Sequence, residues 1–276
     1  MLGFLIYMNR SGSTLLSRYL DEYEGIGVTP EARFPDGIFF KERIIRKQED
    51  IDLYLDLLYS NHKFRSWNIP RNQLHESFSR LTFPAGFRET FPVIMQHYFE
   101  VDPPQVQVYK SPYIHNLEEL REIFPEALVI LIYRDIRAVY NSKKKTIDTD
   151  LNRPMAASPF WEVIQYKKML KTKKRLKGKP WFHELKYEDL VKAPDQEIRK
   201  LLDAIGISSV RKKDDSGYYS KLSEKQKLIH GNLQKAPLEE RIYGWKDELD
   251  RASLWVFQVF LRKKLKQQGY PLAEVK

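Results

Sequence analysis

The 276-residue sequence predicts an α/β protein, a three-layer sandwich in which helices cover both faces of a central, mostly parallel sheet. Short apolar runs alternate with longer segments of helical periodicity along the chain. The clearest runs carry no polar residue, which is typical of strands buried on both faces, and no Pro/Gly/Ser-rich linker divides the sequence. We therefore expect a single domain over residues 1–276.

The expected strands are the apolar runs at residues 2–8, 106–109, 127–133 and 181–185. The run at 127–133 is the clearest, because Pro125 precedes it and Arg134 and Asp135 follow it. Helical periodicity predicts helices over residues 13–23, 117–124, 136–145, 160–176, 193–205 and 254–267. A loop is expected through Pro154 and Pro159.

Residues 37–100 are predicted to be helical, with interruptions at Pro70, Pro84 and Pro92. Residues 51–59 are the clearest amphipathic piece of this region. Its place between the first and second expected strands makes it a helical insertion, which we expect to lie on the acceptor side of the site proposed below.

The formal net charge of +10 indicates an anionic partner. Lys and Arg are spread over the whole length without a nucleic-acid-binding motif, and a small polyanionic cofactor, an acidic acceptor or both would account for the positive charge equally well. The absence of cysteine excludes disulfides and thiolate sites. No apolar run reaches the ~18 residues of a membrane span, so the expectation is a cytoplasmic protein or a catalytic domain trimmed of its anchor.

The stretch YMNRSGSTLL, residues 7–16, joins the first expected strand to the first helix as a phosphate-binding loop does. The nucleotide-triphosphate loop needs a lysine where Ser13 stands, so that motif fails here. Arg10 adds positive charge, and amides and hydroxyls at a helix N-terminus favour an anion; the four residues that offer them are Ser11, Gly12, Ser13 and Thr14. A helix start capped by Ser11 or Ser13 fits this stretch equally well.

A second anion-binding pattern follows the strongest strand. Arg134 stands at its carboxyl end, and Ser142 comes eight positions later on the next helix. Ligands of open α/β sheets bind beyond the carboxyl ends of the strands, so Arg134 is expected to face the same crevice as the first loop. An arginine and a serine at this spacing can bind one phosphate together. Two such patterns indicate a ligand charged at both ends.

These residues resemble the motifs of sulfotransferases that use 3′-phosphoadenosine 5′-phosphosulfate (PAPS). The segment from Arg10 to Leu16 is similar to their 5′-phosphosulfate loop, and Arg134-Asp-Ile-Arg-Ala-Val with Ser142 is similar to their 3′-phosphate motif. The resemblance continues in register to the end of the chain. It implies a P-loop-like phosphosulfate-binding loop, PAPS as co-substrate and no metal.

Later segments add to the resemblance. Tyr187-Glu-Asp-Leu resembles the segment after the third core strand of these enzymes. His230-Gly-Asn232 and Gly244-Trp245-Lys246 resemble their cofactor-covering loop. The cofactor-binding residues that the resemblance implies are Arg10, Ser11, Gly12, Ser13, Thr14, Arg134, Ser142, Tyr187, Asn232, Trp245 and Lys246.

The segment GVTPEARFP, residues 27–35, is similar to tyrosylprotein sulfotransferases in particular. The resemblance implies that Glu31 is the catalytic base and Arg33 a substrate-binding residue. Lys110 matches a lysine that these enzymes place after the next core strand, and with Arg10 it completes the implied catalytic set.

The function expected from these features is transfer of a sulfuryl group from PAPS to a hydroxyl of a protein or peptide tyrosine. A glycan acceptor is the alternative, since related acidic bases occur in glycan sulfotransferases. Two more distant alternatives are a nucleotide kinase, disfavoured by Ser13, and a non-catalytic polyanion binder. The expected partner is an acidic peptide, protein or glycan, with no role for nucleic acid.

Overall fold

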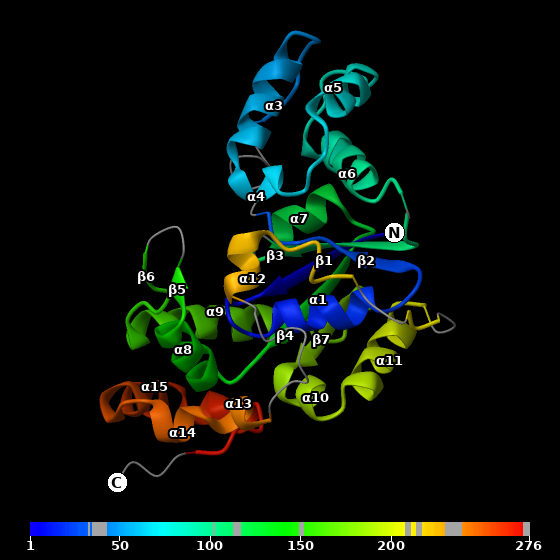
Figure 1. The fold of residues 1–276 in the computed structure, drawn as a ribbon. Coiled ribbons are helices and arrows are strands. Elements are labelled where there is room, and N and C mark those ends of the chain that lie inside the picture. Colours follow the sequence, from blue (N-terminus) through cyan, green and yellow to red (C-terminus); the bar gives the residue numbers. More distant parts are fainter. Residues whose placement is uncertain are drawn as a thin grey trace.

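The centre of the molecule is a five-stranded sheet in which every strand pair is parallel (Figure 1). The strand order is β2-β3-β1-β4-β7. The strands are β1 (Leu2–Tyr7), β2 (Ile26–Val28), β3 (Val106–Ser111), β4 (Leu128–Tyr133) and β7 (Phe182–Lys186). The structure is a computed structural model that describes residues 1–32, 34, 43–101, 103–112, 117–148, 152–207, 211–213, 217–229 and 239–272. The predicted α/β class with a mostly parallel sheet is confirmed.

Alternate residues of β1 point into two separate hydrophobic cores, one on each face of the sheet. Phe4 and Ile6 belong to one core, and Leu5 and Tyr7 belong to the other. This alternation follows from the two-residue period of a strand, and burial on both faces explains why the run carries no polar residue.

Helices cover both faces, which gives the three layers. The helices of the Leu5 face are α1 (Ser13–Asp21), α10 (Tyr187–Lys192) and α11 (Pro194–Ala204). Those of the Phe4 face include α7 (Leu117–Ile123), α8 (Ile136–Lys145), α9 (Pro159–Leu176) and α15 (Arg251–Gln267).

The region expected as a helical insertion forms helices that lie together at the top of Figure 1. They are α3 (Asp50–Ser60), α4 (His62–Arg65), α5 (Arg71–Ser79) and α6 (Phe87–Tyr98). The interruption expected at Pro92 is wrong, because Pro92 lies inside α6. Phe91, Ile94 and Met95 around it are fully buried, so tertiary packing outweighs the backbone hydrogen bond that proline removes.

Several short elements were not expected from the sequence. The expected loop before α9 contains an antiparallel hairpin of β5 (Ile147–Asp148) and β6 (Arg153–Pro154). The others are β2, α10, α12 (Glu224–Ile229), α13 (Glu240–Tyr243) and α14 (Trp245–Glu248). Each of these elements has six residues or fewer, which is too short to show a clear hydrophobic period.

Candidate active site

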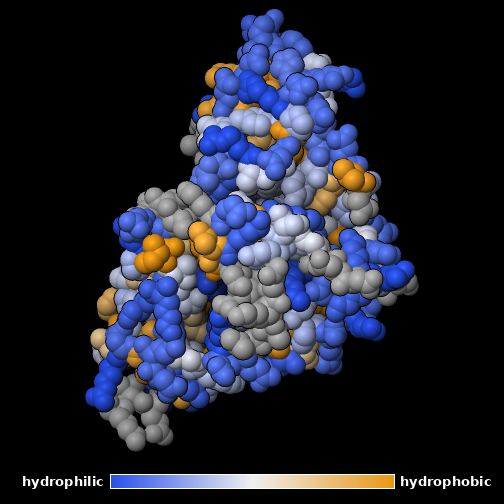
Figure 2. All heavy atoms as spheres, in the orientation of Figure 1, coloured by the Kyte–Doolittle hydropathy of each residue, from blue (hydrophilic) through white to orange (hydrophobic). Residues whose placement is uncertain are grey.

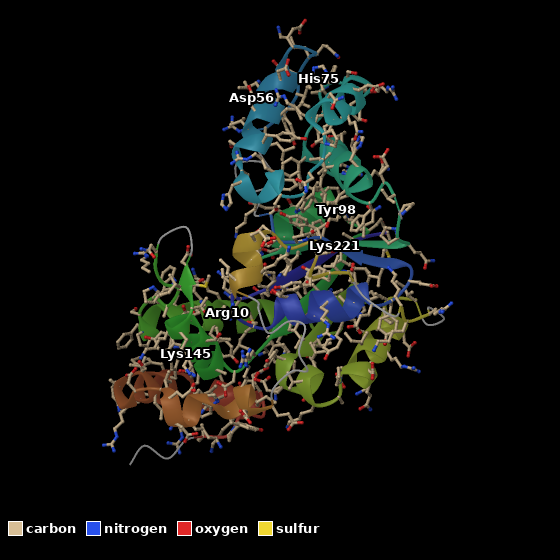
Figure 3. All side chains as sticks on the ribbon, viewed as in Figure 1. Arg10, Asp56, His75, Tyr98, Lys145 and Lys221 are labelled. Atoms are coloured by element: carbon tan, nitrogen blue, oxygen red, sulfur yellow. The ribbon has the colours of Figure 1, made fainter. Side chains whose placement is uncertain are left out.

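The two predicted anion-binding segments meet at one edge of the sheet. Strands β1 and β4 are neighbours, with Tyr7 opposite Ile132, so the loops that follow them leave the sheet side by side. Residues from both loops line a cavity of about 1020 Å³. Figure 3 shows Arg10 between α1 and α8, with Lys145 further along α8.

The loop after β1 presents backbone amides to this cavity. Gly12 is the N-cap of α1 with φ of 94°, and no side chain caps the helix. The capped-helix interpretation therefore does not describe this start, and the N-terminus of α1 suits an anion. Gly12, Ser13 and Thr14 line the cavity, whereas the Ser11 amide donates to the Met8 carbonyl at 3.1 Å.

Tyr187, the first residue of α10, packs between the two segments. A Cβ atom on Gly12 would lie 2.2 Å from Cδ2 of Tyr187, so the ring fills the space next to the glycine. The Arg134 guanidinium lies 4.1 Å from the centre of the same ring. Tyr187 therefore sets the distance between the first loop and Arg134.

Arg134 is 7% exposed and carries an unsatisfied donor. Its Nη1 donates to the Arg10 carbonyl at 3.4 Å, and its Nη2 donates to the Arg241 carbonyl. Its Nε is buried and has no hydrogen-bond partner in the described part of the chain. A buried guanidinium with an unused donor at a cavity wall fits a phosphate.

Arg10 connects the first loop to the second motif, since its Nε donates to Ser142 Oγ at 3.1 Å. Burial lowers the pKa of the Arg10 guanidinium to about 10, with repulsion from Arg134 and Arg241 contributing to the shift. Arg134 and Arg241 therefore lie close enough to Arg10 to repel it at this end of the cavity. An anion bound there would offset that repulsion.

Lys110 brings a positive charge to the first loop from β3. Its Nζ donates to Thr14 Oγ1 at 2.8 Å and lies 5.6 Å from the centre of the Tyr7 ring. Burial lowers the pKa of the Lys110 ammonium to about 8; the charge of Glu31 opposes this shift, and Lys63 and Arg10 add to it. A lysine from the neighbouring strand thus occupies the region that a loop lysine serves in nucleotide-triphosphate sites.

Glu31 lies on the same cavity, and its carboxylate contacts Tyr7 and Lys63. The Tyr7 hydroxyl donates to Oε2, and Lys63 Nζ forms an ion pair with Oε1 at 2.8 Å. Gln226 Nε2, from α12, lies 3.5 Å from the Glu31 carbonyl oxygen. These contacts fix the position of the carboxylate and stabilise its charge.

Lys63 was not predicted from the sequence. It lies in α4, whose start is capped by Asn61 accepting from the amides of Lys63 and Phe64. The cap could have indicated a helix, but no local signal shows that this lysine reaches Glu31. Tyr7 could have been found, since it ends β1 at the edge of the sheet where ligands bind.

The remaining predicted residues fall into three groups. Ser142 and Lys246 line the cavity. Trp245 is 1% exposed and is not part of the cavity wall; its indole packs on the Arg137 guanidinium at 3.7 Å. Arg33 and Asn232 lie outside the described residues.

The described residues show neither a clear metal site nor a membrane span. No group of three or more His, Asp or Glu side chains among them could hold a metal ion. None of the helices built from them is both long enough and apolar enough to cross a membrane.

The fold is α/β, and the candidate site combines the two predicted anion-binding segments with a partly buried carboxylate and a buried lysine. A model of the sulfotransferase family matches residues 4–211. The chain therefore belongs to the sulfotransferase family, which confirms the resemblance found in its motifs.

Solved structures of sulfotransferases share the fold. The sulfotransferase domain of the Synechococcus PCC 7002 olefin synthase has a TM-score of 0.55 at 16% identity and covers 94% of both chains. The sulfotransferase domain from the curacin biosynthetic pathway has a TM-score of 0.57 at 14% identity, covering 99% of both chains. Mouse sulfotransferase SULT7A1, solved with PAP, has a TM-score of 0.51 at 12% identity and covers 96% of this chain and 84% of its own. No curated protein sequence matches the chain.

Replacing Gly12 with alanine should destabilise the protein by about 2–4 kcal/mol, as strain at positive φ adds to overlap with Tyr187. Gly206→Ala is the matched control, because Gly206 has φ of 81° but a Cβ atom added there would meet nothing within 4 Å. It should cost only the strain, about 1 kcal/mol. Urea unfolding of both variants measures the difference. Equal losses would show that the Tyr187 contact does not constrain the loop.

Proposed function

We propose that this sulfotransferase moves a sulfuryl group from PAPS to an acceptor hydroxyl. The observation that carries the proposal is the pair of anion-binding segments, after β1 and β4, that open on one cavity beside Glu31 and Lys110. Adenosine 3′,5′-bisphosphate, the product of such a reaction, carries phosphates at two ends, which matches the two segments. The mouse structure solved with PAP shares the fold and supports this choice.

The two ends of the co-substrate are assigned to different residues. The amides of Gly12, Ser13 and Thr14 hold the 5′-phosphate at the start of α1. Arg134 and Ser142 hold the 3′-phosphate, where the unused Nε of Arg134 becomes a donor to it. Arg10, which contacts Ser142, lies between the two ends.

When bound, PAPS supplies an activated sulfuryl group. Glu31 accepts the proton of the acceptor hydroxyl at a carboxylate that Tyr7 and Lys63 keep in place. Lys110 and Arg10 place positive charge where negative charge develops on the leaving phosphate, as preorganised cations do in phosphoryl transfer.

For the acceptor, we propose the phenolic hydroxyl of a tyrosine in a peptide or protein. Leu222 and Ile229 line the cavity on either side of Gln226, which lies against Glu31, and these apolar side chains suit an aromatic ring. Figure 2 shows a largely hydrophilic face on which a small group of apolar side chains lies over the β5–β6 hairpin and α12. A glycan acceptor would make less use of such apolar walls.

Residues 37–100 are proposed to form the acceptor side of a single domain that spans the chain. The support is Lys63, which extends from α4 to the catalytic carboxylate. The excess of Lys and Arg over Asp and Glu in the chain suits an acidic sequence around the acceptor tyrosine. Arg33 is proposed to contact the acceptor as well.

The assignment is tested by incubating the protein with radiolabelled PAPS and a panel of acidic tyrosine peptides, oligosaccharides and small phenols. We expect label on the tyrosine peptides. Label on oligosaccharides alone would select the glycan alternative. Failure to label any acceptor, together with stronger stabilisation by ATP and magnesium than by adenosine 3′,5′-bisphosphate, would select a nucleotide kinase instead.

Glu31→Gln keeps the shape of the side chain and removes the base. It should lower kcat by about 10²–10⁴-fold, while affinity for adenosine 3′,5′-bisphosphate stays within about threefold of wild type. Steady-state turnover and calorimetric titration measure the two quantities. Near-normal turnover with full co-substrate binding would exclude Glu31 as the base.

Activity should also depend on the charge of Lys110. Because burial lowers the pKa of its ammonium to about 8, the charged fraction falls as pH rises through that value. The value of kcat/KM for PAPS, which reports the free enzyme, should therefore decline above about pH 8. Lys110→Arg should retain the charge and move this decline to higher pH. If kcat/KM of the Lys110→Arg variant declined at the same pH as that of the wild type, another group would control the decline.

A further inference from the structure

Two helices carry a group of exposed large apolar side chains that do not line the cavity. They are Phe160, Trp161 and Ile164 on α9 and Trp255, Val259 and Phe260 on α15. We call this group the aromatic patch. Each of its members is between 43% and 53% exposed, and none lines the cavity. Six such residues on adjacent elements are unusual for the surface of a globular protein and mark an interaction site.

The patch is continuous across the two helices. α9 and α15 pack against each other, and the rings of Phe160 and Phe260 lie 5.5 Å apart. Phe160 and Ile164 are four residues apart on α9, as Trp255 and Val259 are on α15, so each pair shares a helix face. The opposite faces of both helices are buried in the hydrophobic core, so the two helices are fixed with the patch facing outward.

The exposed charges on α9 and α15 themselves are all positive, and Asp250, just before α15, is paired with Lys144. The exposed or half-buried cations of these two helices include Lys167, Lys168, Lys171, Arg251, Arg262 and Lys263. The Nζ of Lys167 lies 5.7 Å from the centre of the Phe260 ring, so this cationic border touches the apolar area directly. The carboxylate on α9, Glu162, is 1% exposed and paired with Lys143, and α15 contains no acidic residue.

We propose that the aromatic patch docks the protein on an anionic lipid bilayer. Trp and Phe side chains favour the boundary between headgroups and acyl chains, and lysines and arginines beside them attract anionic headgroups. A second copy of the chain fits less well. A twofold interface through the patch would place its cationic border against an identical border, with no exposed carboxylate from α9 or α15 to compensate.

Vesicle sedimentation with the full chain tests this proposal. Binding to vesicles of phosphatidylcholine mixed with anionic phosphatidylglycerol should exceed binding to pure phosphatidylcholine at least tenfold. The binding should weaken as salt is raised. Tryptophan emission should shift to the blue on binding, because Trp161 and Trp255 leave water.

Trp255→Glu should lower the affinity for anionic vesicles at least tenfold, and Leu53→Glu is the matched control. Leu53 is 63% exposed on α3, away from the patch, so its variant should bind as wild type does. Unchanged circular dichroism and unchanged binding of adenosine 3′,5′-bisphosphate show that both variants fold. If the Trp255→Glu variant does not fold, the Val259→Ser variant is tested in its place.

Absence of binding to anionic vesicles would overturn the proposal, as would equal binding by wild type and the Trp255→Glu variant. A concentration-dependent dimer that Trp255→Glu dissolves, seen in sedimentation without lipid and without vesicle binding, would assign the patch to a second copy instead.

Discussion

The neighbouring positions of β1 and β4 in the sheet are the constraint on which the site depends. Because the two strands are parallel and adjacent, the chain leaves both at the same edge, where Arg10 and Arg134 come together. Without a ligand this arrangement is unfavourable, since Arg10 is repelled by both Arg134 and Arg241. The packing of Gly12 and Arg134 against Tyr187 keeps the charges in place. The fold therefore maintains a site whose electrostatic cost an anion would reduce.

The same edge explains the lysine missing from the first loop. In this chain the positive charge comes from Lys110 on β3, the strand on the other side of β1, and it reaches Thr14 at the start of α1. Its low pKa follows from burial beside other cations. Because Lys110 supplies the positive charge from a neighbouring strand, position 13 needs no lysine and is a serine. The loop sequence then differs from the motif of a nucleotide-triphosphate site.

Much of the fold, and several residues of the segments after β1 and β4 that line the cavity, could be predicted from the sequence, because they depend on local patterns. The buried strands, the long helices and both arginine segments are examples, and the order of strands and helices indicated that the segments meet. The contact of Lys63 with Glu31 could not be predicted, since it joins a helix of the insertion to a loop through tertiary packing alone. For Trp245 the sequence motif predicted a cofactor-binding residue. The neighbouring Lys246 lines the cavity, but the Trp245 ring is buried in the core against Arg137.

The central claim is that the segments after β1 and β4 bind the two ends of one ligand. Calorimetric titration with adenosine 3′,5′-bisphosphate and with adenosine 5′-phosphate tests it most directly. Wild type should bind the bisphosphate about 10–100-fold more tightly than adenosine 5′-phosphate, which is the effect of one charge-assisted hydrogen bond. The Arg134→Gln variant should lose this preference, while its affinity for adenosine 5′-phosphate stays nearly unchanged. Equal affinity of wild type for both ligands, or a preference that survives in Arg134→Gln, would contradict the account.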